Sequence, residues 1–200
     1  MARRNPGAVD ARPCGPGGRR PAIDDAGWVG AAQRVDSPNR DARPPGTTVT
    51  LAVIHGISLP PGGFGGPGVV DLFTNRLDPD AHPYFAGIAH LRVSAHFLIR
   101  RRGELFQFVA CGERAWHAGA SSWRGRAGCN DYSIGIELEV ADDRAYTAAQ
   151  YLRLARLVRL LRRRYPLPDL AGHSDVAPGR KTDPGPAFDW DRLRRLLAGG

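Results

Sequence analysis

The chain has 200 residues, of which 42% are hydrophobic and 24% charged, and its formal net charge is +8 at pH 7. This length suits one domain with a sizeable core, and no apolar run reaches the 18 or more residues of a membrane-spanning helix. The three cysteines are widely spaced and form no CxxC pair, which argues against a disulfide framework or a cysteine-based metal site.

The positive charge is concentrated in two segments. Residues 1–22 hold five arginines and one aspartate, and residues 147–164 hold six arginines and no acid, which amounts to +4 and +6. The remainder of the chain therefore carries a small negative balance. A solvated surface explains this distribution better than a nucleic-acid site does, because the charge lies on a tail and on one helix face.

The first segment of the chain differs in composition from the rest. Residues 1–22 are rich in Pro, Gly and Arg and contain almost no large apolar side chain. Such a segment buries too little surface to fold, so we expect a disordered extension over 1–22 and one domain over 23–200. Its arginines are not followed by the apolar segment of an export signal, and we therefore expect a cytoplasmic protein.

Several segments have the patterns of strands. Residues 50–55 form a short apolar run that suits a buried strand ending on a histidine. Residues 94–99 and 104–109 are predicted to pair antiparallel around a turn at 101–103. In 133–139, isoleucine and leucine alternate with glutamate, which predicts a strand with one apolar and one polar face.

Helices are predicted in three places. A short helix is expected over 69–75, and a final amphipathic helix over 189–197. Between them, residues 147–150 have the sequence of a capping box, which starts an amphipathic helix that ends before Pro166. Strands interleaved with helices, together with a tight hairpin, predict an α/β fold: a single domain with a mixed β-sheet flanked by helices.

The stretch 171–186 carries a dense group of ionisable side chains. It contains His173, Lys181 and Asp183 among glycines and prolines, which predict a rigid loop rather than a helix or a central strand. Lys181 and Asp183 are two residues apart, so their side chains point to the same side of an extended segment. A rigid loop with such groups is more often a site than a connector.

Two imidazoles and one carboxylate, with a fourth position left for water, are the ligand set of a catalytic zinc site. His55, at the end of its predicted strand, together with His173 and Asp183 would provide that set. The spacing alone leaves a second interpretation open, in which both histidines are hydrogen-bonded to backbone groups, because His55 is distant from the other two residues.

Five segments carry recognisable motifs, in this order: 53–62 (VIHGISLPPG), 90–96 (HLRVSAH), 114–119 (RAWHAG), 129–139 (CNDYSIGIELE) and 172–188 (GHSDVAPGRKTDPGPAF). In sequence and order they resemble the AmpD family of cytosolic zinc amidases, within the N-acetylmuramoyl-L-alanine amidase superfamily. The resemblance extends from about residue 28 to 196. It implies the fold shared by these amidases and the peptidoglycan-recognition proteins.

The resemblance also implies the roles of individual residues. It implies that His55, His173 and Asp183 hold Zn²⁺, which would activate a water molecule and polarise the scissile carbonyl. Glu137 matches the acidic residue that takes the proton of that water, and Lys181 the basic residue that steadies the developing oxyanion. Without the family match, an exposed strand carboxylate and a solvated loop lysine would be the simpler interpretations of these two residues.

The family's substrate is a 1,6-anhydro-N-acetylmuramyl-peptide, cut between the lactyl group of muramic acid and L-alanine. By resemblance Arg92 binds the substrate, Trp116 packs on the sugar and His117 lines the cleft, although Trp116 also suits a core position. Gly56 and Gly128 depart from the asparagine and arginine of close family members, which removes a donor and a cation from the expected cleft.

Three other functions stay open at this point. A broader peptidoglycan amidase would accept non-anhydro muropeptides, a recognition module would bind without hydrolysis, and a nucleic-acid-binding protein would use the arginine-rich segments. The missing export signal counts against the first, the full ligand set against the second and the location of the arginines against the third. We therefore expect a zinc amidase whose partner is a muropeptide, with no membrane partner and with an oligomeric state that no pattern reveals.

Overall fold

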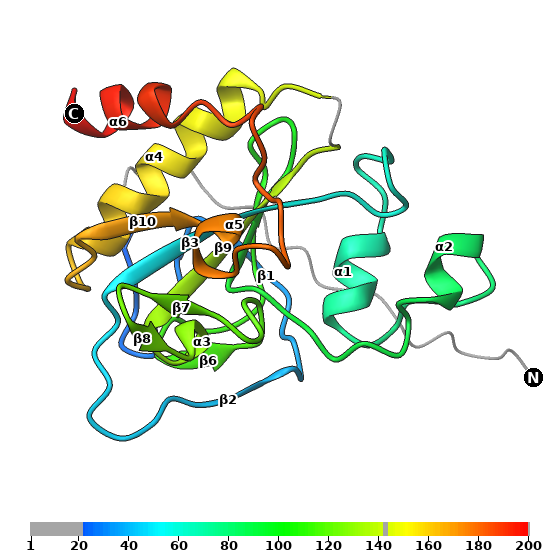
Figure 1. Ribbon diagram of the computed structural model, residues 1–200, viewed down its shortest axis with the longest axis horizontal. Helices are drawn as coiled ribbons and strands as arrows, with labels where there is room; N and C mark the ends of the chain where they lie inside the picture. Colours follow the sequence, from blue (N-terminus) through cyan, green and yellow to red (C-terminus); the bar gives the residue numbers. More distant parts are fainter. Residues whose placement is uncertain (1–21, 142–143, 200) are drawn as a thin grey trace, which may run out of the picture.

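The computed structural model describes residues 22–141 and 144–199 (Figure 1). At its centre is a six-stranded sheet in the order β1-β5-β4-β9-β3-β10. Its strands are β1 (Gln33–Arg34), β3 (Leu51–Ile57), β4 (Phe97–Ile99), β5 (Leu105–Gln107), β9 (Ser133–Glu139) and β10 (Asp169–Gly172). Strand β5 is antiparallel to β4, and the other neighbouring pairs are parallel. The predicted α/β class with a mixed sheet is confirmed.

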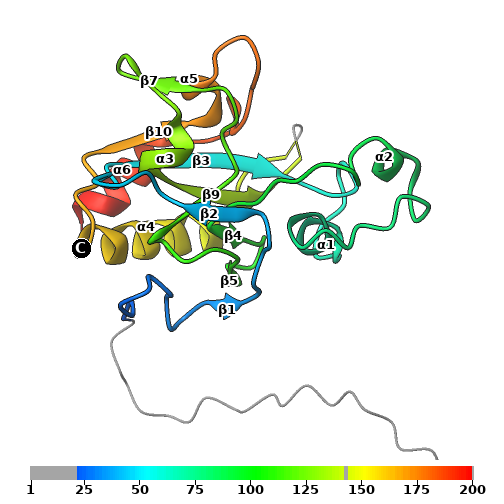
Figure 2. The same cartoon turned by 90° about the horizontal axis from the view of Figure 1, so that it is seen from below.

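Helices lie on both faces of this sheet. The helices of the described residues are α1 (Gly68–Phe73), α2 (Pro83–Ala86), α3 (Cys129–Tyr132), α4 (Ala148–Arg162), α5 (His173–Val176) and α6 (Trp190–Ala198). Two small antiparallel pairs join β2 (Arg40–Ala42) to β6 (Glu113–Ala115) and β7 (Ser122–Trp123) to β8 (Arg126–Ala127). Figure 2 shows α4 on one face of the sheet and α3, α5 and β7 on the other.

The alternation of side chains along the central strands determines which face carries the polar residues. On β3, Ala52 and Ile54 pack in the cluster that contains α4, whereas Val53 packs with residues of α3 and α5. His55 follows Val53 by two positions, so its side chain lies on the face away from α4. The parallel register pairs His55 with Glu137 of β9, and the two side chains therefore share that face.

Strand β9 is buried along its whole length. Its alternation predicted a polar face, and the simpler interpretation of Glu137 was an exposed carboxylate, yet Glu137 is only 8% exposed. That interpretation is wrong because β9 lies between β4 and β3 while α4 covers one face, and the segment carrying His117 covers the other at Gly135.

The helix signals agree closely with the structure. Thr147 and Gln150 form the predicted capping box at the start of α4, and Asp189 caps α6 through a bond from the Arg192 amide. The predicted hairpin is present as β4 and β5, with shorter strands.

In the described ranges, no helix has the length and apolar character needed to cross a bilayer. The predicted extension over 1–22 lies, except for Ala22, outside the described residues, and the boundary at 22/23 stays a prediction.

The prediction of a loop over 171–186 is wrong for its first six residues. Ala171 and Gly172 end strand β10, and the next four residues form α5. Proline occurs in this stretch only from Pro178 onward, so nothing before it interrupts backbone pairing. Gly172 lies opposite Ile54 in the parallel register with β3, and His173 therefore follows directly from the sheet.

Candidate active site

The carboxyl ends of β3, β9 and β10 meet at a cavity of about 430 Å³. In open α/β sheets, the crevice beyond the carboxyl ends of the parallel strands is the usual place for a ligand. Seven of the eight predicted site residues line this cavity or lie directly against it: His55, Trp116, His117, Glu137, His173, Lys181 and Asp183. The fold thus brings together residues from four separate segments of the chain.

His55, His173 and Asp183 converge on one point. His55 Nδ1 lies 3.0 Å from His173 Nδ1 and 3.3 Å from Asp183 Oδ2, and His173 Nδ1 lies 3.1 Å from the same oxygen. Zinc holds nitrogen and oxygen ligands at about 2.0–2.2 Å, which separates neighbouring ligands of a tetrahedral ion by ~3.3 Å. The three donor atoms therefore fit a single zinc ion.

The charge states of these side chains also suit a metal. Burial lowers the pKa of His55 to about 4, so its ring is the neutral imidazole that binds metals. Burial by itself raises the pKa of Asp183, but the close contacts of its carboxylate with His173 and His55 outweigh it and hold that pKa well below its ordinary range. The site thus presents nitrogen lone pairs and an anionic oxygen to one another at close range.

Glu137 stands beside this group. It is buried, it lines the cavity, and its Oε2 atom has no hydrogen-bond partner within the part of the chain that the structure describes. Burial, and after it the negative charge of Asp183, raises the pKa of Glu137 well above its ordinary range. Leaving a buried polar atom without a partner costs about 1–3 kcal/mol, and strongly perturbed carboxylates of this kind cluster at functional sites.

The remaining predicted site residues differ in their positions. Lys181 is exposed and lines the same cavity as Glu137. Trp116 is partly buried and also lines the cavity. Arg92 is exposed, is not among the cavity-lining residues, and donates to the backbone carbonyls of residues 89–91 at 3.2–3.4 Å. Its predicted role in substrate binding stays a prediction.

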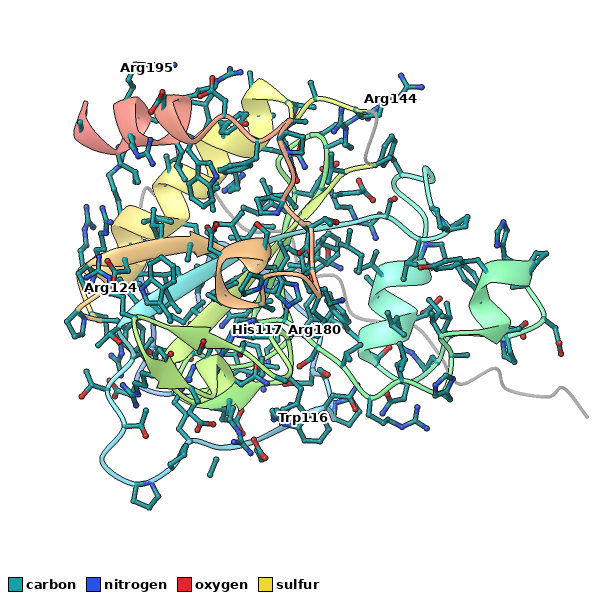
Figure 3. The ribbon with its side chains drawn as sticks, viewed as in Figure 1. Trp116, His117, Arg124, Arg144, Arg180 and Arg195 are labelled. Carbon is teal, nitrogen blue, oxygen red and sulfur yellow. The ribbon has the colours of Figure 1, made fainter. Side chains whose placement is uncertain are left out.

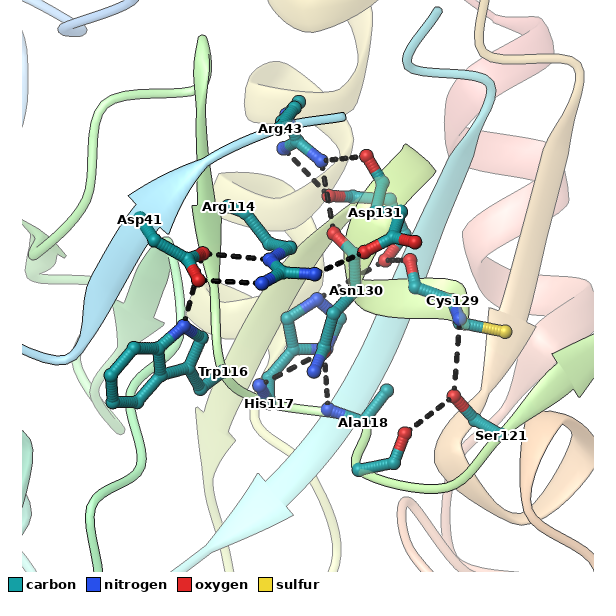
Figure 4. A network of polar contacts seen from close by, with 12 residues as sticks. Asp41, Arg43, Arg114, Trp116, His117, Ala118, Ser121, Cys129, Asn130 and Asp131 are labelled. Carbon is teal, nitrogen blue, oxygen red and sulfur yellow. Dashed lines mark hydrogen bonds and ion pairs between the residues drawn. The ribbon is translucent and has the colours of Figure 1, made fainter. Parts of the chain in front are cut away.

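Trp116 is held by a network of charged side chains (Figure 4). Its indole Nε1 donates to Asp41 Oδ1 at 3.2 Å. Arg114 donates to the same Asp41 oxygen and to Asp131 Oδ1, both at 2.6 Å, and the hydrogen bonds from Arg114 lower the pKa of Asp41. Strand β2, strand β6 and helix α3 therefore jointly orient the indole ring.

The sequence predicted only one of the contacts that His117 makes, its place on the cavity wall. His117 lines the cavity as expected, but its Nδ1 also lies 2.9 Å from Nε2 of His55, and its Nε2 lies 3.1 Å from Ser133 Oγ. No spacing rule connects these three positions. The one available signal was Gly135 in the middle of a buried strand, which marks a close approach of another group.

The segment after Trp116 is fixed from two sides. Asn130 Oδ1 accepts the backbone N–H groups of His117 and Ala118, at 3.1 Å and 2.8 Å. Arg180, labelled with His117 in Figure 3, donates to the carbonyl oxygen of Ala118. The loop that contains Lys181 is thereby tied to the segment that contains His117.

Comparisons with known proteins agree with this site. Residues 45–186 match the family described as N-acetylmuramoyl-L-alanine amidase. The 1,6-anhydro-N-acetylmuramyl-L-alanine amidase AmpD of Citrobacter freundii is 59% identical over 175 residues, which cover 86% of this chain and 94% of that protein. The AmpD of Escherichia coli K12 is 58% identical over 176 residues, or 87% of this chain and 96% of that one.

A solved structure is similar to this chain in its fold as well as in its sequence. The crystal structure of a selenomethionine AmpD derivative superimposes with a TM-score of 0.85 at 59% identity, covering 86% of this chain and 98% of that one. The family match includes β3 and the loop that carries Asp183, so it contains all three of the converging side chains. The chain therefore belongs to the AmpD family of N-acetylmuramoyl-L-alanine amidases.

Proposed function

We propose that this protein is a zinc-dependent amidase that cleaves the bond between the lactyl group of 1,6-anhydro-N-acetylmuramic acid and L-alanine in recycled muropeptides. The observation that carries the proposal is the convergence of His55 Nδ1, His173 Nδ1 and Asp183 Oδ2 within 3.3 Å of one another. The substrate is the one for which the Citrobacter freundii relative is named. A location in the cytosol stays a prediction.

The three converging residues provide the donors for the metal. Zinc held by His55, His173 and Asp183 would lower the pKa of a water molecule and polarise the scissile carbonyl. Because burial keeps His55 neutral near pH 7, its ring does not have to lose a proton before it binds. The position of Asp183 in the same loop as Lys181 places the donor set beside a cation.

Glu137 performs the proton transfers in this proposal. It takes a proton from the attacking water, whose oxygen forms the new bond to the lactyl carbonyl carbon. It then gives that proton to the nitrogen of L-alanine as the C–N bond breaks, so the products are a lactyl carboxyl group and a free amine. The raised pKa of Glu137 suits a group that must both accept and donate a proton near neutral pH.

Other side chains stabilise charge and bind the substrate. The Lys181 ammonium group stabilises the negative charge that develops on the carbonyl oxygen. Trp116, oriented by Asp41, offers an aromatic face to the sugar. Arg92, at the surface beyond the cavity, is the proposed contact for the peptide carboxylates, and His117 lines the cavity wall.

The experiment uses the purified full chain with two substrates, a 1,6-anhydro-muropeptide and the same peptide on an intact muramyl sugar. Products are identified by mass spectrometry, with zinc added or with a chelator. We expect a peptide with a free L-alanine amine, formed from the anhydro substrate and only in the presence of zinc. Cleavage after complete metal removal would overturn the metal role, equal cleavage of both substrates would favour the broader amidase, and binding without cleavage would favour a recognition module.

A further inference from the structure

A chain of three hydrogen bonds leads from His55 to a backbone carbonyl. His55 Nε2 lies 2.9 Å from His117 Nδ1, His117 Nε2 lies 3.1 Å from Ser133 Oγ, and the Ser133 hydroxyl donates to the carbonyl oxygen of Cys129. We propose that His117, anchored by Ser133, is a positioning residue that holds His55 in the tautomer whose Nδ1 is free to bind the metal. This inference rests on the proposed metal site.

The direction of each hydrogen bond follows from the last one. A carbonyl oxygen only accepts, so the single hydroxyl proton of Ser133 is used in the bond to Cys129. Ser133 Oγ must then accept from His117, which places the proton of the neutral His117 ring on Nε2. His117 Nδ1 remains an acceptor and receives the Nε2–H of His55. The proton of His55 is thereby held on the side away from the other two ligands.

This proton assignment leaves two acceptors facing each other. The Nδ1 lone pair of His55 points at the Asp183 carboxylate oxygen 3.3 Å away. Two such atoms repel at this distance unless a positive charge or a donated proton lies between them. Groups behind a ligating histidine are usually carboxylates or carbonyls. Here the neutral ring of His117 takes that place, so it orients the ligand without adding negative charge to the site.

The His117 ring lies where neighbouring elements leave it little freedom. The Asn130 side chain holds its backbone N–H at 3.1 Å, and Ser133 and His55 engage both ring nitrogens. On β9, a Cβ atom added at Gly135 would lie 2.5 Å from Cγ of the imidazole. The strand thus approaches the ring at a residue without a side chain, which is the arrangement expected for a ring whose exact position matters.

The test measures zinc affinity of the metal-free full chain by competition with a chromophoric chelator. His117→Phe keeps a ring in this space but removes both nitrogens, and we expect it to weaken zinc binding by about 10–100-fold. His117→Gln retains one acceptor and one donor, and we expect it to recover most of the loss. Ser133→Ala removes only the anchor, so we expect a smaller loss than for His117→Phe.

A matched control is available at His96. This histidine is also buried, its ring centroid lies 5.8 Å from that of His117, and it bonds to the Gly135 amide and the Glu113 carbonyl rather than to His55. We expect His96→Gln to lower the thermal unfolding temperature while zinc affinity of the folded protein stays at the wild-type value. An equal loss of affinity in His96→Gln and His117→Phe would make the effect structural and overturn the inference.

Nitrogen-15 NMR of the imidazoles tests the tautomer without any substitution, so the inference remains testable if a variant fails to fold. In the metal-free wild type we expect the His55 proton on Nε2. A proton on Nδ1, or wild-type zinc affinity in His117→Phe, would overturn the inference. A raised KM for the muropeptide in His117→Phe, with zinc affinity unchanged, would show that His117 contacts the substrate rather than positioning His55. Failure of the wild type to bind zinc at all would overturn the proposed function, which is a distinct result.

Discussion

At the residue scale, burial changes the pKa values of the side chains in the site. It lowers the pKa of His55 to about 4 and raises that of Glu137 well above its ordinary range. The common cause is that an apolar surrounding disfavours the charged form of either group. One consequence is a neutral metal ligand, and the other is a carboxyl group able to carry a proton near neutral pH.

The proton-transfer role of Glu137 predicts the effect of Glu137→Gln. The amide has nearly the same shape but cannot accept the water's proton, so kcat is expected to fall by about 10²–10⁴-fold. Zinc content, measured by atomic absorption, is expected to stay at one ion per chain because Glu137 is not one of the three proposed ligands. Turnover at the wild-type rate would remove Glu137 from the mechanism.

The oxyanion role of Lys181 predicts that charge matters more than shape at this position. We expect Lys181→Ala to reduce kcat by about 10²–10³-fold with zinc still bound. Lys181→Arg keeps the positive charge and serves as the comparison, with a smaller reduction. Steady-state kinetics on the anhydro-muropeptide would check both variants, and equal turnover in Lys181→Ala and the wild type would show that the role is wrong.

At the element scale, strand register and close approaches arrange the site. The parallel pairing of β3 with β9 puts His55 opposite Glu137, and the pairing of β3 with β10 brings the start of α5 to the same edge. Glycine occurs where other elements approach these strands closely. Gly56 at the end of β3 is one such place, because an added Cβ would lie 2.8 Å from both Tyr146 Oη and Val140 Cγ1.

This contact predicts the result of introducing at Gly56 the asparagine that the family resemblance leads us to expect there. In this chain we expect Gly56→Asn to lower the free energy of unfolding by about 1–3 kcal/mol, because the added side chain overpacks the site. Gly66→Asn is the control, since nothing lies within 4 Å of a Cβ there. Urea unfolding would compare the two variants. An unchanged midpoint for Gly56→Asn would contradict the steric explanation of why glycine occupies this position.

At the scale of the whole molecule, the proposed metal would join distant parts of the chain. His55 and His173 are 118 positions apart, and they come from different elements. A ligand that binds only the folded state stabilises it, by about 2.7 kcal/mol at a free concentration 100 times its Kd. Metal binding and folding are therefore coupled in this protein if the proposal holds.

This coupling predicts a response to metal removal. In the wild type, a chelator is expected to lower the melting temperature by about 5–10 °C relative to the zinc-saturated protein. His173→Ala and Asp183→Ala are expected to melt at the same temperature with and without chelator, because each lacks one ligand. Differential scanning calorimetry makes the comparison, and a wild-type melting temperature that does not respond to zinc would contradict a shared ion.

Features that depend on residues close together in the chain could be predicted before the fold was known. The capping box of Thr147 with Gln150 and the cap at Asp189 join residues within one helical turn, so they could be predicted from spacing alone. The alternation in 133–139 correctly predicted a strand, and the ordered motifs were sufficient to indicate the family. These signals are local, or they are stretches of sequence compared directly with known ones.

Features that depend on contacts between distant residues became visible only in the folded chain. The alternation of β9 could not show that both of its faces are buried. The glycine and proline content of 171–186 predicted a loop where β10 ends and α5 begins. Likewise, the bond between His55 and His117 joins positions 62 residues apart. Burial, pKa and tautomer are set by whatever packs against a side chain, and for this site those neighbours come from other segments of the chain.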